Sequence, residues 1–324
     1  MSTSEYKFVP AAEGGGIVPE GRQAADSRAL KLAGKSFGAV PLLPRSLSSR
    51  LLVVMQPQNA PGTKIIGDLS VERDQPGGVP TYWLAAEQRS SGTIVSLHGG
   101  AYIAGPQAGQ WGWLAKLCRR AGVAGAAVMY RMPPRDPFPA ALDDSIAAIE
   151  ALQGVGHLRE GSWLLAGDSA GGGLALATAQ ALRDRGASLP AGLLLTAPWV
   201  DLEMANPELD ASELTDPFLS RKYLGWSARL YADGVALSDP RLSPINGGLD
   251  GLPPVHLNVG TRDLLRPDVQ RLRDGLLQAG VPVTYIEQEG GMHTYPQMAG
   301  AAGEWAVREQ VRWTRNLLAH STNS

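Results

Sequence analysis

Residues 164–182 read LLAGDSAGGGLALATAQAL, an apolar run followed by a glycine-bounded serine and then by apolar residues at helical spacing. This order predicts a strand, a sharp turn and a helix, with Ser169 at the turn. A serine there must adopt strained backbone, and glycine at 167 and 171 avoids side chains that would clash with the neighbouring strand and helix. We expect the turn to lift the hydroxyl into a pocket at the helix N-terminus, whose backbone N–H groups favour negative charge.

Composition fits an ordinary globular chain. The 324 residues are 44% hydrophobic and 19% charged, enough for one large α/β domain or two small ones. The net charge is −2 and no basic cluster stands out in the sequence, so nucleic acid and anionic membrane surfaces are poor candidates as partners. No run of eighteen apolar residues and no signal-like start occur, which makes a cytoplasmic location without integral membrane association the default expectation. The single cysteine, Cys118, excludes an intrachain disulfide and a thiolate metal site, and its apolar-periodic setting predicts a buried helix residue.

From residue 93 onward, apolar runs of strand type alternate with stretches of helical periodicity. Strands are expected at 93–98, 124–132, 162–167, 191–198, 253–261 and 281–289, and helices at 107–122, 139–153, 169–182, 266–280 and 302–320. This alternation implies right-handed crossovers and a mainly parallel sheet covered on both faces, an α/β fold. Two earlier strands, in 64–74 and 79–87, predict a hairpin that adds an antiparallel edge.

The chain is expected to form one domain with a lid, because no repeat or low-complexity linker interrupts the pattern. Residues up to about 16 are expected to be poorly ordered, and 24–55 to be helical. The assignment is an N-terminal helical segment contributing to the lid at 1–60, a core at 61–199 and 240–324, and a lid insertion at 200–239. Loops at the carboxyl ends of the parallel strands should hold the ligand.

A serine nucleophile needs a base and an acid that orients the base. His293 lies in a glycine-bounded loop after a strand, in EGGMHTYPQM, and Asp263 follows the strand before it. The order Ser169, Asp263, His293 is the chain order of the α/β-hydrolase triad. Asp268 is the main rival for the acid, but it should already lie in the following helix. The remaining histidines are in less suitable places: His98 before a glycine pair, His157 in a surface-like loop, His256 inside an apolar strand and His320 in the polar tail.

The loop HGGAYIAG, residues 98–105, is the candidate for the second arm of an oxyanion hole. Backbone N–H groups of Gly100 and Ala101, with Gly99 as a further candidate, are expected to converge with that of Ala170 on a carbonyl oxygen. The alternative is a simple glycine hinge. His98 is expected to hold this loop through a side-chain hydrogen bond.

Asp168, beside the nucleophile, is expected to brace the turn through a hydrogen bond to a neighbouring loop rather than to handle protons.

Several of these stretches resemble motifs of the hormone-sensitive lipase family. HGGAY at 98–102 resembles its HGGG-type motif, and GDSAGG at 167–172 is similar to its GDSAGG; Arg131 with PFPAA at 137–141, GTRDLL at 260–265 and GMH at 291–293 also fall where members carry related sequence. The resemblance implies an α/β-hydrolase fold with a helical lid and carboxylic ester hydrolysis without a cofactor. Ala101 stands where the motif has its third glycine, which would narrow the acyl site, and residues before about 60 match nothing specific.

The resulting hypothesis is a serine carboxylesterase for short- to medium-chain esters, since the lid is only moderately apolar. Six aromatic residues are candidates for lining its pocket, although core packing is the default for each: Trp111, Trp113, Trp199, Phe218, Tyr223 and Trp226. An amidase or peptidase of the same fold stays open, as does a non-catalytic ligand-binding receptor, which the presence of His293 disfavours. Dimerisation is predicted if residues 281–289 form an exposed edge strand.

Overall fold

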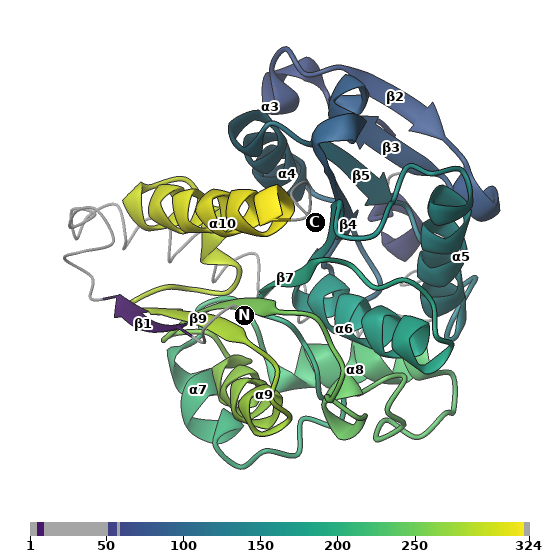
Figure 1. The fold of residues 1–324 in the computed structure, drawn as a ribbon. Helices are drawn as coiled ribbons and strands as arrows, with labels where there is room; N and C mark the ends of the chain where they lie inside the picture. Colours follow the sequence, from purple (N-terminus) through teal and green to yellow (C-terminus); the bar gives the residue numbers. More distant parts are fainter. Residues whose placement is uncertain (1–4, 10–50, 57–58, 321–324) are drawn as a thin grey trace.

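The computed structural model describes residues 5–9, 51–56 and 59–320. These residues form a nine-stranded sheet in the order β1-β9-β8-β7-β6-β4-β5-β3-β2 (Figure 1). The strands are β1 Glu5–Val9, β2 Val71–Asp74, β3 Thr81–Leu84, β4 Thr93–Leu97, β5 Ala124–Val128, β6 Trp163–Asp168, β7 Gly192–Thr196, β8 Val255–Gly260 and β9 Val283–Gln288.

Strands β4 to β9 pair in parallel, whereas β3 runs antiparallel to both β5 and β2. The predicted parallel sheet with an antiparallel hairpin at its edge is therefore confirmed. The first hairpin strand is shorter than expected, because Thr63–Ile66 form the short helix α3 instead. Ile66 is buried there, and its carbonyl accepts a hydrogen bond from Arg119, which anchors the end of α3.

Helices cover both faces of the sheet (Figure 1). The helices are α4 Ala108–Ala121, α5 Ala140–Gly154, α6 Ser169–Asp184, α9 Arg266–Gln278 and α10 Ala301–His320. Alternate residues of a strand point to opposite faces, and each central strand accordingly contributes to two apolar clusters. Ile94 and Leu164 pack with α4 and α10, whereas Val95 and Leu165 pack with α5, α6 and α9. Burial on both faces of the sheet thus explains why the central strands are uninterrupted apolar runs in the sequence.

The N-terminal part of the chain differs from expectation. Residues 5–9, expected to be poorly ordered, form β1, which pairs in parallel with β9. Since β9 lies between β1 and β8, it is not an exposed edge strand, and the condition for the predicted dimerisation is not met. Residues 51–54 are helical, as predicted, Met55 lies in a turn, and residues 24–50 of the expected helices fall outside the described residues.

Between β7 and β8 the chain forms α7, Leu209–Thr215, and α8, Arg221–Ala232. This agrees with the expected helical insertion without a strand. Cys118 is buried in α4, as predicted. Among the helices of the described part of the chain, none has the length and apolarity needed to cross a bilayer.

Candidate active site

The turn between β6 and α6 has the strained geometry that the sequence predicts. Ser169 has φ of 52°, in the left-handed region. A Cβ at Gly171 would lie 2.1 Å from the carbonyl oxygen of Leu97, and one at Gly167 would lie 2.2 Å from that of Gly171. Both contacts are with backbone that cannot swing away, so glycine is required at these two positions for α6 to approach the sheet.

The three residues predicted to act together meet at the carboxyl ends of β6, β8 and β9. Nε2 of His293 lies 2.9 Å from Oγ of Ser169, and Nδ1 of His293 lies 2.9 Å from Oδ2 of Asp263. All three side chains are buried. Because the carboxylate accepts from Nδ1–H, Nε2 is left as the acceptor for the serine hydroxyl.

Asp268 lies in α9, as expected for the rival acid, and it bonds to Asn206 and Arg271 rather than to His293. Asp263 is fixed by a different contact, since its Oδ1 accepts the N–H of Leu265 at 2.9 Å. The structure therefore joins the predicted acid, and not its rival, to the imidazole.

Burial and the neighbouring carboxylates act in opposite directions on the pKa of His293. Burial alone lowers its pKa, but the negative charge of Asp263, then those of Asp216 and Asp168, outweigh burial and raise the pKa above 6.5. The imidazole is thus a stronger base than a free histidine.

The loop after β4 corrects one prediction. The N–H of Gly99 donates to Oδ1 of Asp168 at 3.1 Å, so Gly99 is not free to bind an oxyanion. Among the described residues, the N–H groups of Gly100 and Ala101 have no protein acceptor. Ala170 is the second residue of α6, in the first turn where N–H groups lack an intrahelical partner. Three of the four predicted donors therefore remain available.

His98 and Asp168 hold this loop as predicted. Nδ1–H of His98 donates to the Gly99 carbonyl at 2.9 Å, and the ring stacks on Tyr130 with centroids 4.3 Å apart. Burial lowers the pKa of His98 to about 4, so its ring is neutral at pH 7. The Oδ2 of Asp168 accepts from Gln110 of α4 at 2.9 Å, which ties the loop, the turn and the helix together.

A cavity of about 120 Å³ opens beside Ser169 and His293. Its wall includes Gly100 and Ala101 of the β4 loop and four residues of the insertion, namely Phe218, Leu219, Tyr223 and Leu224. Of the six aromatic residues considered from sequence, Phe218 and Tyr223 line this cavity, whereas Trp111, Trp113 and Trp199 are buried in the core and Trp226 packs against it. The insertion between β7 and β8 therefore covers the candidate site.

Sequence reasoning missed Asp216, a half-buried carboxylate in the insertion. Its Oδ1 accepts the N–H groups of Phe218 and Leu219 at 2.7 and 2.8 Å, and its Oδ2 accepts that of Leu264 at 2.7 Å. Burial and then the charge of Asp263 raise the pKa of Asp216, while His293 lowers it. The only local signal was the Asp-Pro pair at 216–217, which favours a turn in which the carboxylate bonds to N–H groups just ahead of it.

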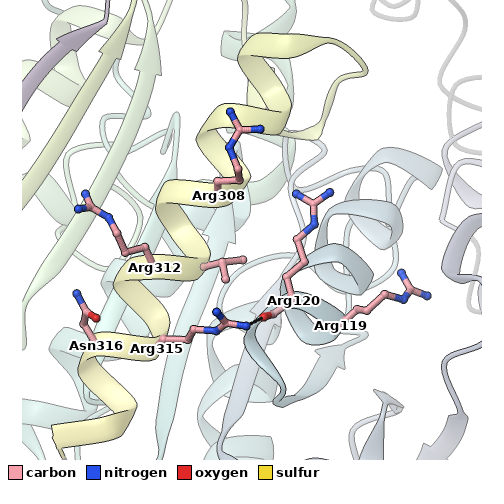
Figure 2. Close-up of a pocket in the computed structure, with 7 residues that line it drawn as sticks. Arg119, Arg120, Arg308, Arg312, Arg315 and Asn316 are labelled. Carbon is pink, nitrogen blue, oxygen red and sulfur yellow. Dashed lines mark hydrogen bonds between the residues drawn. The ribbon is translucent and has the colours of Figure 1, made fainter. Parts of the chain in front are cut away.

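A second and more open cleft, about 680 Å³ in volume, lies between α4 and α10 (Figure 2). It is lined by Arg119, Arg120, Arg308, Val311, Arg312, Arg315 and Asn316. The fold thus assembles a basic cluster that the sequence does not reveal, because its arginines lie in two distant stretches. Their guanidinium groups point in different directions in Figure 2, and three of them pair with Asp68, Glu304 and Glu309. These arginines therefore do not converge on a common centre.

Comparison with known proteins agrees with the geometry. A family model described as alpha/beta hydrolase fold matches residues 94–297, more than half of the chain. The chain belongs to the alpha/beta hydrolase family. An acetyl-hydrolase of Streptomyces hygroscopicus is 37% identical to this hydrolase over 213 residues, 66% of this chain and 71% of the relative. An esterase of Acinetobacter venetianus is 31% identical over 209 residues, 64% of this chain and 69% of the relative.

Solved structures extend the similarity beyond the motifs. A crystal structure of an esterase from the bacterial hormone-sensitive lipase family superposes on this hydrolase with a TM-score of 0.77 and 29% identity, covering 89% of this chain and 98% of the other. The predicted resemblance to the hormone-sensitive lipase family is therefore confirmed, and it includes segments outside the quoted motifs.

Proposed function

We propose that this hydrolase is a serine carboxylesterase that cleaves short- to medium-chain esters through an acyl-enzyme. The observation that carries the proposal is the continuous chain of contacts from Ser169 through His293 to Asp263, each 2.9 Å long. The names of the acetyl-hydrolase and esterase relatives support the same reaction class.

In the first half of the reaction, Ser169 Oγ attacks the ester carbonyl while its proton passes to Nε2 of His293. Asp263 holds the ring in the tautomer whose Nε2 is free and stabilises the imidazolium that forms. The imidazolium then gives its proton to the leaving alcohol. Water repeats the sequence on the acyl-enzyme, with His293 again acting first as base and then as acid.

The N–H groups of Gly100, Ala101 and Ala170 are the proposed donors to the tetrahedral oxyanion. Such donors act most strongly in a water-poor site, where each contributes about 2.7 to 4 kcal/mol to the transition state. Gly99 contributes indirectly, because its bond to Asp168 holds the loop that carries the first two donors.

The size of the cavity favours small acyl groups. At about 120 Å³ it is smaller than the ~300–1,000 Å³ typical of sites for drug-sized ligands. Phe218 and Tyr223 close one side of it, and Ala101 narrows the loop side by one methyl group. We therefore expect acetate to butyrate esters to be the best substrates, with activity falling along the medium chain lengths.

The proposal is tested with a series of p-nitrophenyl esters from acetate to dodecanoate and with the matched p-nitroanilide of the best acyl group. We expect ester cleavage that Ser169→Ala reduces by about 10⁶-fold and Asp263→Asn by about 10⁴-fold. Asp268→Asn serves as the matched control and should retain turnover per folded molecule. Faster cleavage of the anilide than of the ester would favour the amidase alternative, and turnover that survives Ser169→Ala would refute the serine mechanism.

A further inference from the structure

The carboxylate of Asp216 connects two parts of the candidate site that are distant in the sequence. One of its oxygens fixes the backbone of Phe218 and Leu219, which line the cavity wall. The other accepts the N–H of Leu264, the residue that follows Asp263. A single side chain of the insertion therefore holds both the cavity wall and the turn that presents the acid.

We propose that Asp216 is a positioning residue of the esterase reaction: it fixes the Asp263 turn against the cavity wall and sets a second negative charge near the His293 ring. This inference rests on the proposed function, since it assigns Asp216 a role in positioning the same triad. Asp216 itself touches no reacting atom. It acts through Asp263 and His293.

The hydrogen bonds favour the ionised form of Asp216. Both of its oxygens accept backbone N–H groups, which stabilise the carboxylate, as does His293, whereas burial and the charge of Asp263 act in the opposite direction and raise its pKa. Arg262, which lies in the same turn as Asp263, donates its Nε to the carbonyl of Thr215 and not to the Asp216 carboxylate.

Three carboxylates act on the imidazole, each from a different element. Asp263 comes from the turn after β8, Asp216 from the insertion, and Asp168 from the end of β6. Asp168 is bonded to Gly99 and Gln110, and Asp263 to Leu265 and the imidazole, so Asp216 is the one of these three charges that the insertion carries. Displacement of the insertion would therefore lower the pKa of His293 and at the same time move the Phe218 and Leu219 backbone that lines the cavity.

The test compares Asp216→Asn with Asp210→Asn. Asparagine can still accept the Phe218 and Leu219 N–H groups but has no charge. Asp210 lies in α7 of the same insertion and pairs with Arg221, so its substitution removes a charge away from the triad. The readouts are the pH dependence of kcat/KM and the pKa of His293 measured by NMR in a Ser169→Ala background.

We expect Asp216→Asn to lower the His293 pKa, and the acid limb of kcat/KM, by about 0.5 to 1 pH unit. Its kcat should fall by about tenfold, because the acid turn is held less well. Asp216→Glu keeps the charge, so its acid limb of kcat/KM should have a midpoint close to that of the wild type. Asp210→Asn should leave this midpoint unchanged.

A lower kcat with an unchanged His293 pKa would overturn the inference, since it would reduce Asp216 to a structural residue. An acid limb that moves to higher pH would also contradict it. The NMR titration of His293 needs no turnover. An unchanged His293 pKa would therefore refute the inference while the esterase proposal stands, and the titration can still be measured if the protein proves not to cleave esters. If Asp216→Asn does not fold, the His293 pKa is measured in Asp216→Glu, which keeps the charge. A decrease in that pKa as large as the one expected for charge removal would count against the inference.

Discussion

The amide nitrogen of Gly99 lies 3.1 Å from Oδ1 of Asp168, which joins the loop after β4 to the turn that carries Ser169. The other carboxylate oxygen accepts from Gln110 of α4. A Cβ at Gly99 would lie 2.4 Å from Oδ2 of Asp168, so the glycine is what allows this approach. The candidate oxyanion donors and the nucleophile are therefore held by one shared carboxylate.

Replacement of Asp168 by alanine should loosen this connection. The Gly99 N–H would lose its acceptor in a buried place, at a cost of about 1 to 3 kcal/mol of stability. We expect kcat for an acetate ester to fall by more than tenfold, because Gly100 and Ala101 are no longer held in place. Asp168→Asn keeps an acceptor oxygen and should lose less. Denaturant unfolding and steady-state kinetics measure both effects, and equal losses in the two variants would argue against this role.

Alanine at Gly171 should be strongly destabilising. The added Cβ would meet the carbonyl oxygens of Leu97 and His98 at 2.1 and 2.4 Å, and a tightly packed backbone cannot yield without moving α6 from the sheet. We expect a loss of about 3 kcal/mol or more in the free energy of unfolding. Gly154→Ala, in α5 with open space around its Cβ, is the control and should be neutral or stabilising. Similar unfolding free energies for the two variants would show that the close approach does not exist in solution.

The pH dependence of activity should follow His293. Protonation removes the base, so kcat/KM is lost as the pH falls through the pKa of this ring. Since burial is outweighed by Asp263, Asp216 and Asp168, that pKa lies above 6.5 and the acid limb should have its midpoint above pH 6.5. A rate profile with a neutral ester measures it. A midpoint near pH 4 would instead point to a group such as His98 and contradict the assignment of the base.

Phe218 should limit the length of the acyl group. Phe218→Ala removes an aromatic wall from the cavity, and the ratio of kcat/KM for hexanoate to that for acetate should rise by about tenfold or more. Leu214→Ala alters an exposed side chain of the same insertion, 88% accessible, and should leave the ratio unchanged. A preference for acetate that persists in Phe218→Ala would mean that another residue sets the limit.

The local features of the serine turn were predictable because they depend on neighbouring residues. Glycine at 167 and 171, the strand before Ser169 and the helix after it follow from spacing and steric size alone. Asp263 and His293 were predictable for a related reason, since strand periodicity places both at carboxyl ends of parallel strands, where loops converge.

Other features depend on contacts between distant segments. The loss of Gly99 as an oxyanion donor follows from where the Asp168 carboxylate points, and no pattern in the sequence encodes that direction. The pairing of β1 with β9 places Glu5 beside Thr284, which is far away in the sequence. Asp216 bonds to Leu264 across 48 positions of sequence, and the arginines of the second cleft line one surface only because α4 packs beside α10.

The central claim is that Ser169 is a nucleophile activated by His293, and intact mass after treatment with a fluorophosphonate tests it most directly. The account predicts one adduct per chain on the native protein, no adduct on Ser169→Ala, and normal labelling of Ser188→Ala, which alters an exposed serine. Labelling of His293→Ala should be slowed by several orders of magnitude. Equal labelling of the native protein and Ser169→Ala, or a folded native protein that does not react, would contradict the account.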